Sequence, residues 1–411
     1  MTAPRPARFD AAVTGVGMVT AAGADAARSW EAVVNGGVPA GVGPHPALEG
    51  LPCDFAYVAD ADVRGKLGVA ECRLMDRFAQ LAVVAAREAV ASAGLDSGLW
   101  EGSRVGVVIG NAHGGLPFYD EQHASLRRTG RVSPKTGLLT PVTGATESVT
   151  RDLNASGPSF AVATACASGT HAIGAAHQLL RSGQCDIVIT GGAEAAVGRL
   201  LVASACQLKA LSTRRDDPAS ASRPFDADRD GFVFGEGAGI LVLERPEHAR
   251  ARGAAVLAQV SGYGAATDPE ATVAPAADGA ALERALRTAL ADAGVSGPDV
   301  DHVNAHGTST PANDLVESEV LARVCGEGPL ITSSKAMVGH TLGAAGGIET
   351  ALTVLALRDQ TVPPTANLSS LDPNVRGHVV GKDARPARLE CAVKTAMGFG
   401  GFAAALVLTQ A

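Results

Sequence analysis

One cysteine and two histidines in this sequence occupy positions that suit nucleophilic chemistry. Cys166 follows a short apolar run at residues 160–163 and precedes apolar residues that recur at helical spacing over residues 172–180. This pattern predicts a buried strand, a turn that carries the cysteine, and a helix. The free N–H groups and the dipole at the start of that helix favour a thiolate and can stabilise an oxyanion.

Both histidines follow apolar segments that we expect to be buried strands. His306 comes directly after residues 299–305, and His340 lies in a Gly-rich turn before the helical pattern of residues 343–357. Strand ends are where α/β proteins place their sites. A lone buried cysteine is more often a small core residue, and a lone histidine is more often structural. A cysteine with two histidines in loops of Gly, Ser and Thr instead indicates acyl transfer by a nucleophilic thiol.

The elements that must position these residues form an alternating pattern. The chain has 411 residues and is 46% hydrophobic, which allows a large core in one or two domains. Apolar strands alternate with helical segments throughout, which predicts an α/β protein with buried sheets. We divide it into an N-terminal half, residues 1–250, with the cysteine, and a C-terminal half, residues 251–411, with the histidines. Residues 111–140 are expected to form a long excursion, either a lid or a subunit contact.

Composition excludes several function classes. The net charge of −8 argues against nucleic-acid binding. No apolar stretch is long enough to span a membrane, and the first ten residues lack the apolar core of a signal peptide. Seven cysteines with no CxxC spacing predict neither a disulfide framework nor a zinc site. We therefore expect a soluble cytoplasmic protein without a metal site.

Four segments closely resemble the beta-ketoacyl-acyl-carrier-protein synthases, the stand-alone condensing enzymes of type II systems. They are ATACASGTHAIG at 163–174, RPFDADRDGFVFGEG at 223–237, NAHGTSTP at 304–311 and SKAMVGHTLGAAGG at 334–347. The resemblance covers nearly the whole chain in family order. It implies the thiolase fold, in which two related halves stack as five αβαβα layers, and a dimer.

The resemblance also implies the reaction and the main site residues. Cys166 is expected to take an acyl chain from an acyl-carrier protein. His306 and His340 are expected to bind the carbonyl of a malonyl thioester, which loses carbon dioxide and attacks the acyl-cysteine in a Claisen condensation. Lys335 and Glu349 match the pair that organises the histidine loops, although a surface ion pair is an alternative for them.

Further roles are implied by the same resemblance. Thr308 and Thr310 match hydroxyls that hold the phosphopantetheine arm, unless they only cap their loop. The backbone N–H groups of Cys166 and Phe399 match the oxyanion hole, and Phe399 also matches the gating phenylalanine. Met397 belongs to the same gate and acyl pocket.

The sequence departs from the family pattern at informative places. Thr395 and Ala396 replace the usual Asn-Ser pair, which leaves open whether the chain binds the monovalent cation that some relatives bind. Phe402 replaces a small polar residue near the gate. His113 stands where relatives often have an aliphatic residue of the acyl pocket, and a polar wall suits a polar or unsaturated chain, because burying an unpaired imidazole beside a saturated chain costs free energy.

The resemblance implies partners and leaves the pathway open. An acyl-carrier protein would bring its own phosphopantetheine, so no further cofactor is expected. Basic clusters that include Arg127, Arg128 and Lys209 are expected to receive this partner as an acidic protein, although a single basic cluster is most often only a solvated face. We predict type II polyketide or polyene synthesis, as a homodimer or with a chain-length-factor-like subunit. Housekeeping fatty acid elongation by a homodimer is the nearest alternative. A non-elongating partner subunit and a cysteine hydrolase remain as more distant ones.

Overall fold

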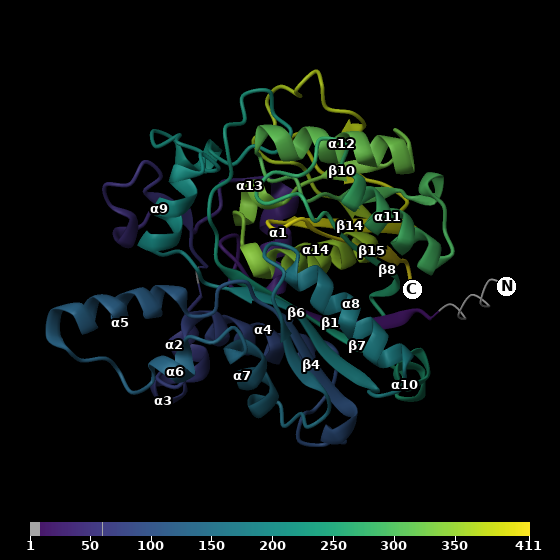
Figure 1. Cartoon of the computed structure of the whole chain (residues 1–411). Coiled ribbons are helices and arrows are strands. Elements are labelled where there is room, and N and C mark those ends of the chain that lie inside the picture. Colours follow the sequence, from purple (N-terminus) through teal and green to yellow (C-terminus); the bar gives the residue numbers. More distant parts are fainter. Residues whose placement is uncertain (1–8, 60) are drawn as a thin grey trace.

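The computed structural model describes residues 9–59 and 61–411, so the expectation about the first eight residues lies outside the described ranges. Its main feature is a single sheet of eleven strands (Figure 1). The spatial order of its strands is β12 (His378–Val379), β10 (Leu330–Thr332), β9 (His302–Asn304), β14 (Cys391–Gly398), β15 (Phe402–Thr409), β8 (Ala258–Thr267), β1 (Ala11–Val19), β7 (Gly237–Glu244), β6 (Ile187–Glu194), β4 (Val105–Gly110) and β5 (Ser159–Val162).

The sheet consists of two halves with the same strand plan. From β1 outward, β7 and β6 are added antiparallel, and β4 and β5 follow in parallel. From β8 outward, β15 and β14 are added antiparallel, and β9 and β10 follow in parallel. The first strands of the two halves, β1 and β8, pair antiparallel over three residues. The structure is therefore a duplicated α/β unit.

Helices cover the sheet in three layers. Between the halves, α8 (Ser168–Arg181) packs on α14 (Ala345–Asp359), and each also contacts the sheet. On the outer faces, α4 (Arg77–Ser92) covers the β1 half and α11 (Ala280–Ala293) covers the β8 half. Separate apolar cores fill the middle layer and the two outer faces. This arrangement confirms the predicted five-layer thiolase fold.

Matching glycines set the spacing of the outer helices. A Cβ atom on Gly15 in β1 would lie 2.1 Å from the carbonyl oxygen of Ala89 in α4. A Cβ atom on Gly262 in β8 would lie 2.2 Å from the carbonyl oxygen of Ala289 in α11. In both halves the first strand can approach its helix this closely only because the strand residue has no side chain.

The remaining elements are shorter or lie at the periphery. The other helices are α1 (Ala26–Asn35), α2 (Val63–Leu67), α3 (Val69–Cys72), α5 (Leu116–Thr129), α6 (Thr136–Leu139), α7 (Gly144–Asp152), α9 (Arg199–Gln207), α10 (Pro246–Ala251), α12 (Pro311–Cys325) and α13 (Lys335–Val338). Two small sheets pair β2 (Val42–Pro44) with β3 (Phe55–Tyr57) and β11 (Thr361–Val362) with β13 (Arg385–Pro386).

Two expectations need comment. The excursion at residues 111–140 contains α5, which projects from the body of the protein (Figure 1). The dividing line at residue 250 falls inside α10 and stays a prediction. Among the residues that the structure describes, no helix is long and apolar enough to cross a membrane.

Candidate active site

Three loops bring the predicted reactive groups to one cavity. Cys166 lies between β5 and α8, His306 between β9 and α12, and His340 between α13 and α14. All three line the same cavity of about 350 Å³. Their exposed fractions are 6%, 3% and 2%, so the cavity holds them away from bulk water.

Each of these loops contains a non-glycine residue with a left-handed backbone. The φ angle is +49° at Ala165, +68° at Ser309 and +49° at Leu342. Such conformations cost free energy and persist only where surrounding contacts impose them. Beside Cys166, the hydroxyl of Ser168 supplies such contacts, because it accepts the N–H of Thr164 at 2.9 Å and donates to the carbonyl oxygen of Ala165 at 2.6 Å.

The two imidazoles face each other edge to face. Their ring centroids lie 5.4 Å apart and the ring planes make an angle of 81°. Burial lowers the pKa of both His306 and His340 well below the usual range, and the ammonium of Lys335 lowers them further. Both rings are therefore neutral near pH 7, and each has one N–H to donate.

The thiol of Cys166 is also held neutral, which corrects the expectation of a thiolate. Burial raises its pKa to about 12 and outweighs the Lys335 charge and the Phe399 N–H, which act in the opposite direction. The helix start alone does not decide the ionisation of this group, because desolvation disfavours the charged form. Its proton must pass to a neighbouring base during acylation, and the neutral imidazoles are the bases that line the cavity.

The segment at residues 398–401 packs directly against the cysteine turn. The backbone N–H of Phe399 donates to the Cys166 thiol. A Cβ atom on Gly398 would lie 2.7 Å from the carbonyl oxygen of Thr164 and 3.2 Å from the nitrogen of Cys166. The N–H groups of Cys166 and Phe399 are thus close enough to act on one oxyanion.

Lys335 and Glu349 lie behind the histidines and do not line the cavity. Lys335 Nζ lies 2.5 Å from Glu349 Oε1 and 2.5 Å from the carbonyl oxygen of His306. Both side chains are buried, so the alternative of a surface ion pair is wrong. The pair fixes the loop that carries His306.

The other predicted site residues divide between the cavity and the surface. Six of them line the cavity: Thr308, Thr310, Met397, Phe399, Phe402 and Lys209. The hydroxyl oxygens of Thr308 and Thr310 lie 2.9 Å apart. His113 is not among the lining residues. Its Nδ1 lies 3.8 Å from the buried carboxylate of Glu194, at the start of the excursion that contains α5. Arg127 and Arg128 lie in the exposed last turn of α5, and α5 contacts α9, which precedes Lys209.

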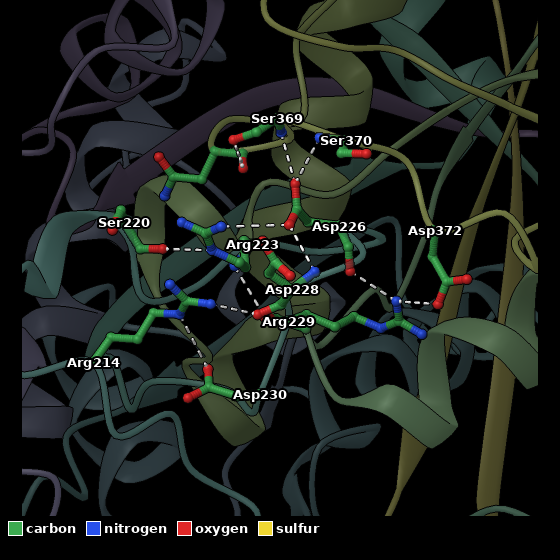
Figure 2. A network of polar contacts seen from close by, with 12 residues as sticks. Arg214, Ser220, Arg223, Asp226, Asp228, Arg229, Asp230, Ser369, Ser370 and Asp372 are labelled. Carbon is green, nitrogen blue, oxygen red and sulfur yellow. Dashed lines mark hydrogen bonds and ion pairs between the residues drawn. The ribbon is translucent and has the colours of Figure 1, made fainter.

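Figure 2 shows a network of polar contacts in the segment that precedes the cavity-lining residues Gly231 and Phe232. Asp226 accepts the N–H groups of Ser369 and Ser370 at 2.7 and 3.0 Å and pairs with Arg223. Arg229 pairs with Asp372 at 2.7 Å and donates to the carbonyl oxygens of residues 226, 310 and 311. The network ties residues 223–230 to the loop after His306, so these two segments are held together.

Sequence reasoning missed two buried groups next to the histidines. Glu317 in α12 accepts the N–H of His306 at 2.7 Å and the hydroxyl of Thr395 at 2.6 Å. Lys394 in β14 lies 2.7 Å from the second carboxylate oxygen of Glu349. In the sequence, Lys394 is notable only as a charged residue within an apolar strand pattern. Its partner Glu349 lies 45 residues away in the chain, so the pair could not be recognised from local spacing.

Comparison with known proteins agrees with this geometry. The sequence matches the models of the Beta-ketoacyl synthase N-terminal domain over residues 9–249 and of the C-terminal domain over residues 257–369. The chain belongs to the beta-ketoacyl synthase family. It is therefore a condensing enzyme of the acyltransferase class.

Relatives of this synthase come from two kinds of system. It is 39% identical over 406 residues to 3-oxoacyl-[acyl-carrier-protein] synthase 2 of Staphylococcus aureus (strain COL), covering 97% of both chains. It is similar to a chain of the ishigamide ketosynthase/chain length factor, with TM-score 0.91, 31% identity and coverage of 98% and 100%. It is also similar to a chain of a type II PKS acyl-carrier protein in complex with its ketosynthase bound to the hexaketide, with TM-score 0.88, 29% identity and coverage of 98% and 100%.

Proposed function

We propose that this synthase condenses a Cys166-bound acyl chain with malonyl-acyl-carrier protein and releases carbon dioxide and 3-oxoacyl-acyl-carrier protein. The single observation that carries the proposal is the meeting of Cys166, His306 and His340 in one buried cavity. A non-elongating partner subunit does not need this constellation. A hydrolase would need water at the acyl-enzyme, and this cavity is lined mostly by apolar residues.

The first half-reaction is acylation of the cysteine. Cys166 Sγ bonds to the carbonyl carbon of the incoming thioester as its proton moves to a neutral imidazole. The N–H groups of Cys166 and Phe399 stabilise the oxyanion of the tetrahedral intermediate. The carbon–sulfur bond to the pantetheine breaks, and the imidazole returns the proton to the pantetheine sulfur, which leaves as a thiol.

The second half-reaction uses the two histidines as donors. They bind the thioester carbonyl of the malonyl group. The bond between the malonyl α-carbon and the carboxylate carbon then breaks, and carbon dioxide is released. The electron pair passes into an enolate, whose oxygen the imidazole N–H groups stabilise. Its α-carbon then bonds to the acyl carbonyl carbon, the bond from that carbon to Cys166 Sγ breaks, and the thiolate regains a proton from solvent.

The pantetheine arm and the acyl chain enter through the described cavity. Thr308 and Thr310 hold the arm, while Met397, Phe399 and Phe402 form the gate and pocket wall. Phe399 is 40% exposed although it touches the cysteine, as suits a side chain at an entrance. For a chain that extends beyond this cavity, His113, which lies beside the carboxylate of Glu194, is the proposed polar part of the acyl pocket.

Two protein partners belong to this proposal. The acyl-carrier protein brings the phosphopantetheine and docks on Arg127, Arg128 and Lys209. The second subunit is an identical chain or a chain-length-factor-like one. Unpaired strand edges and exposed apolar side chains favour association. Here β5 lies at the end of the large sheet with Phe160 41% exposed, and α5 exposes Tyr119.

The pathway and location are inferred in the same way. Likeness to ketosynthases with a chain length factor or a polyketide carrier protein favours type II polyketide or polyene synthesis over fatty acid elongation. Cys53, Cys72, Cys166, Cys185, Cys206 and Cys325 form no disulfide, which favours the reducing cytoplasm.

Mass spectrometry of the Cys166 peptide tests the function directly. The synthase is incubated with a panel of acyl-carrier thioesters of differing length and unsaturation, and then with malonyl-acyl-carrier protein. We expect an acyl adduct on Cys166 that disappears as a 3-oxoacyl product forms. An adduct that decays to free acid would indicate hydrolysis, and the absence of any adduct would contradict the proposal.

A further inference from the structure

Two lysines share one buried glutamate beneath the histidine loops. Lys335 Nζ lies 2.5 Å from Glu349 Oε1, and Lys394 Nζ lies 2.7 Å from Glu349 Oε2. All three side chains are at most 2% exposed. The predicted function explains Lys335, which also donates to the carbonyl oxygen of His306. It gives no role to Lys394.

Two oxygen atoms contact the Lys394 ammonium, and an unpartnered amide oxygen lies on the neighbouring strand. Besides Glu349 Oε2, the ammonium donates to the carbonyl oxygen of Thr395. Asn304 lies beside Lys394 on the paired strand β9, and its Oδ1 is buried with no hydrogen-bond partner among the described residues. A carboxylate, an amide oxygen and a carbonyl oxygen are the ligands that hard metal cations take in proteins.

Charge balance requires a second positive group at this place. Glu317 is also buried and faces Thr395, so two buried carboxylates lie close to His306. Lys335 alone would leave one negative charge unpaired in a site of low polarity, which is strongly unfavourable. With Lys394, two ammonium groups balance the two carboxylates, and both ammonium groups pair directly with Glu349.

Lys394 does not line the cavity, so it does not touch the substrate. Its effect must pass through Glu349 and Lys335 to the backbone of His306. It is a positioning residue for the proposed reaction.

We propose that the Lys394 ammonium is a built-in cation, which takes the place of a bound monovalent ion and makes this synthase independent of potassium and sodium. The residues present do not fit an additional ion beside Glu349, because an ammonium already occupies the free carboxylate oxygen. The inference rests on the proposed function only for its activity measurement.

The native enzyme provides the first test. Melting temperature and malonyl decarboxylation are measured in potassium chloride, sodium chloride and choline chloride at equal ionic strength. We expect the same melting temperature in all three and rates that agree within about twofold, since an ion that binds the folded state would raise its stability with concentration. A melting temperature or rate that falls in choline overturns the proposal.

Two substitutions at the same position provide the second test. Lys394→Ser opens a space next to the two oxygen atoms that the ammonium contacts, whereas Lys394→Met removes the charge but fills the space. We expect both to lose at least about tenfold in decarboxylation, the scale on which groups behind a site act. Potassium or sodium should restore Lys394→Ser in rate and melting temperature and should leave Lys394→Met unchanged. The matched control is Lys382→Met, which removes an exposed lysine and should match the wild type in every salt.

The outcomes separate the two proposals. Full activity of Lys394→Met, or equal rescue of both variants, overturns the role of Lys394. If both variants fail to fold, the melting temperature and rate of the native enzyme in choline chloride still test whether the enzyme needs a bound ion. If the native enzyme forms no 3-oxoacyl product, the proposed function fails, while the melting temperatures still test the built-in cation.

Discussion

The ring of His306 meets the ring of His340 edge to face, with 5.4 Å between their centroids. Both rings are neutral because burial and the Lys335 charge lower their pKa values. A neutral imidazole can donate one N–H to an enolate without first losing a proton. Two such donors on one oxygen are the chief electrostatic contribution that we assign to this site.

His306→Ala and His340→Ala should each slow malonyl decarboxylation by at least about a hundredfold, the scale of one lost oxyanion donor. Release of carbon dioxide from malonyl-acyl-carrier protein measures this. The control is His123→Ala on the exposed face of α5. If either active-site variant kept the rate of the control, the donor assignment would be wrong.

Cys166→Ala should abolish condensation but retain decarboxylation, because the histidine donors remain in place. Product analysis by mass spectrometry, together with carbon dioxide release, distinguishes the two activities. Cys206→Ala removes a half-buried cysteine outside the cavity and should leave both activities intact. Elongation by Cys166→Ala would remove the nucleophile assignment.

Alkylation of Cys166 by iodoacetamide should rise steeply with pH and without a plateau. Burial raises the pKa of this thiol to about 12, so the thiolate fraction grows about tenfold per pH unit below that value. Quantitative mass spectrometry of the Cys166 peptide from about pH 7 to about pH 10 measures the rate. A plateau below pH 9 would mean that the cavity stabilises the thiolate after all.

In a plot of decarboxylation rate against pH, the fall of the rate on the acid side should lie below pH 6.5. The folded-state pKa values of His306 and His340 are lowered from the ordinary value of 6.5, so both rings stay neutral as pH falls to that value. Below pH 6.5 the two histidines take up protons in the unfolded chain before they do so in the folded protein. The free energy of unfolding should therefore decrease together with the rate. Rate and melting temperature against pH test this, and a fall of the rate on the acid side at or above pH 6.5 would contradict it.

Gly398→Ala should slow acylation of Cys166. The added Cβ atom would lie 2.7 Å from the carbonyl oxygen of Thr164, so the segment that supplies the Phe399 N–H must shift. We expect a loss of about tenfold or more, because oxyanion stabilisation depends on donor position. The control is Gly37→Ala, whose Cβ meets no atom within 4 Å. Equal acylation rates would show that the two loops do not act together.

Charge reversal at Arg127, Arg128 and Lys209 should weaken binding of the acyl-carrier protein, most at low ionic strength, where surface charges are least screened. Surface plasmon resonance at two salt concentrations measures the change. The control is Arg388→Glu, an exposed residue that the proposal does not assign to docking. Unchanged affinity of the triple variant would refute this docking surface.

Much of the fold follows from local pattern. Buried strands such as β4 and β6 appear as apolar runs, and α4 and α11 show apolar residues at helical spacing and end at glycines. Two of the site loops follow from the same pattern, because Cys166 and His306 come after strands, whereas α13 lies between strand β10 and His340. These patterns involve residues close together in the chain, so they can be recognised in the sequence without knowledge of the tertiary contacts.

The missed features depend on distant contacts. The helix α5 has no buried residue, so it does not contribute to the apolar core whose pattern identifies the other helices. In the sequence, Lys394 is a charged residue in an apolar strand, and only the structure shows that it pairs with Glu349. The ionisation of Cys166 depends on how deeply the fold buries it, and burial outweighs the helix start that the sequence indicates.

The close approach of Gly15 to α4 and of Gly262 to α11 bears on the origin of the chain. A shorter ancestor that associated with its own copy would have needed one such glycine and would have used it twice. After fusion of the two copies, each was free to specialise. The sulfur nucleophile lies in one such copy and the two imidazoles in the other, so the reaction centre needs both copies.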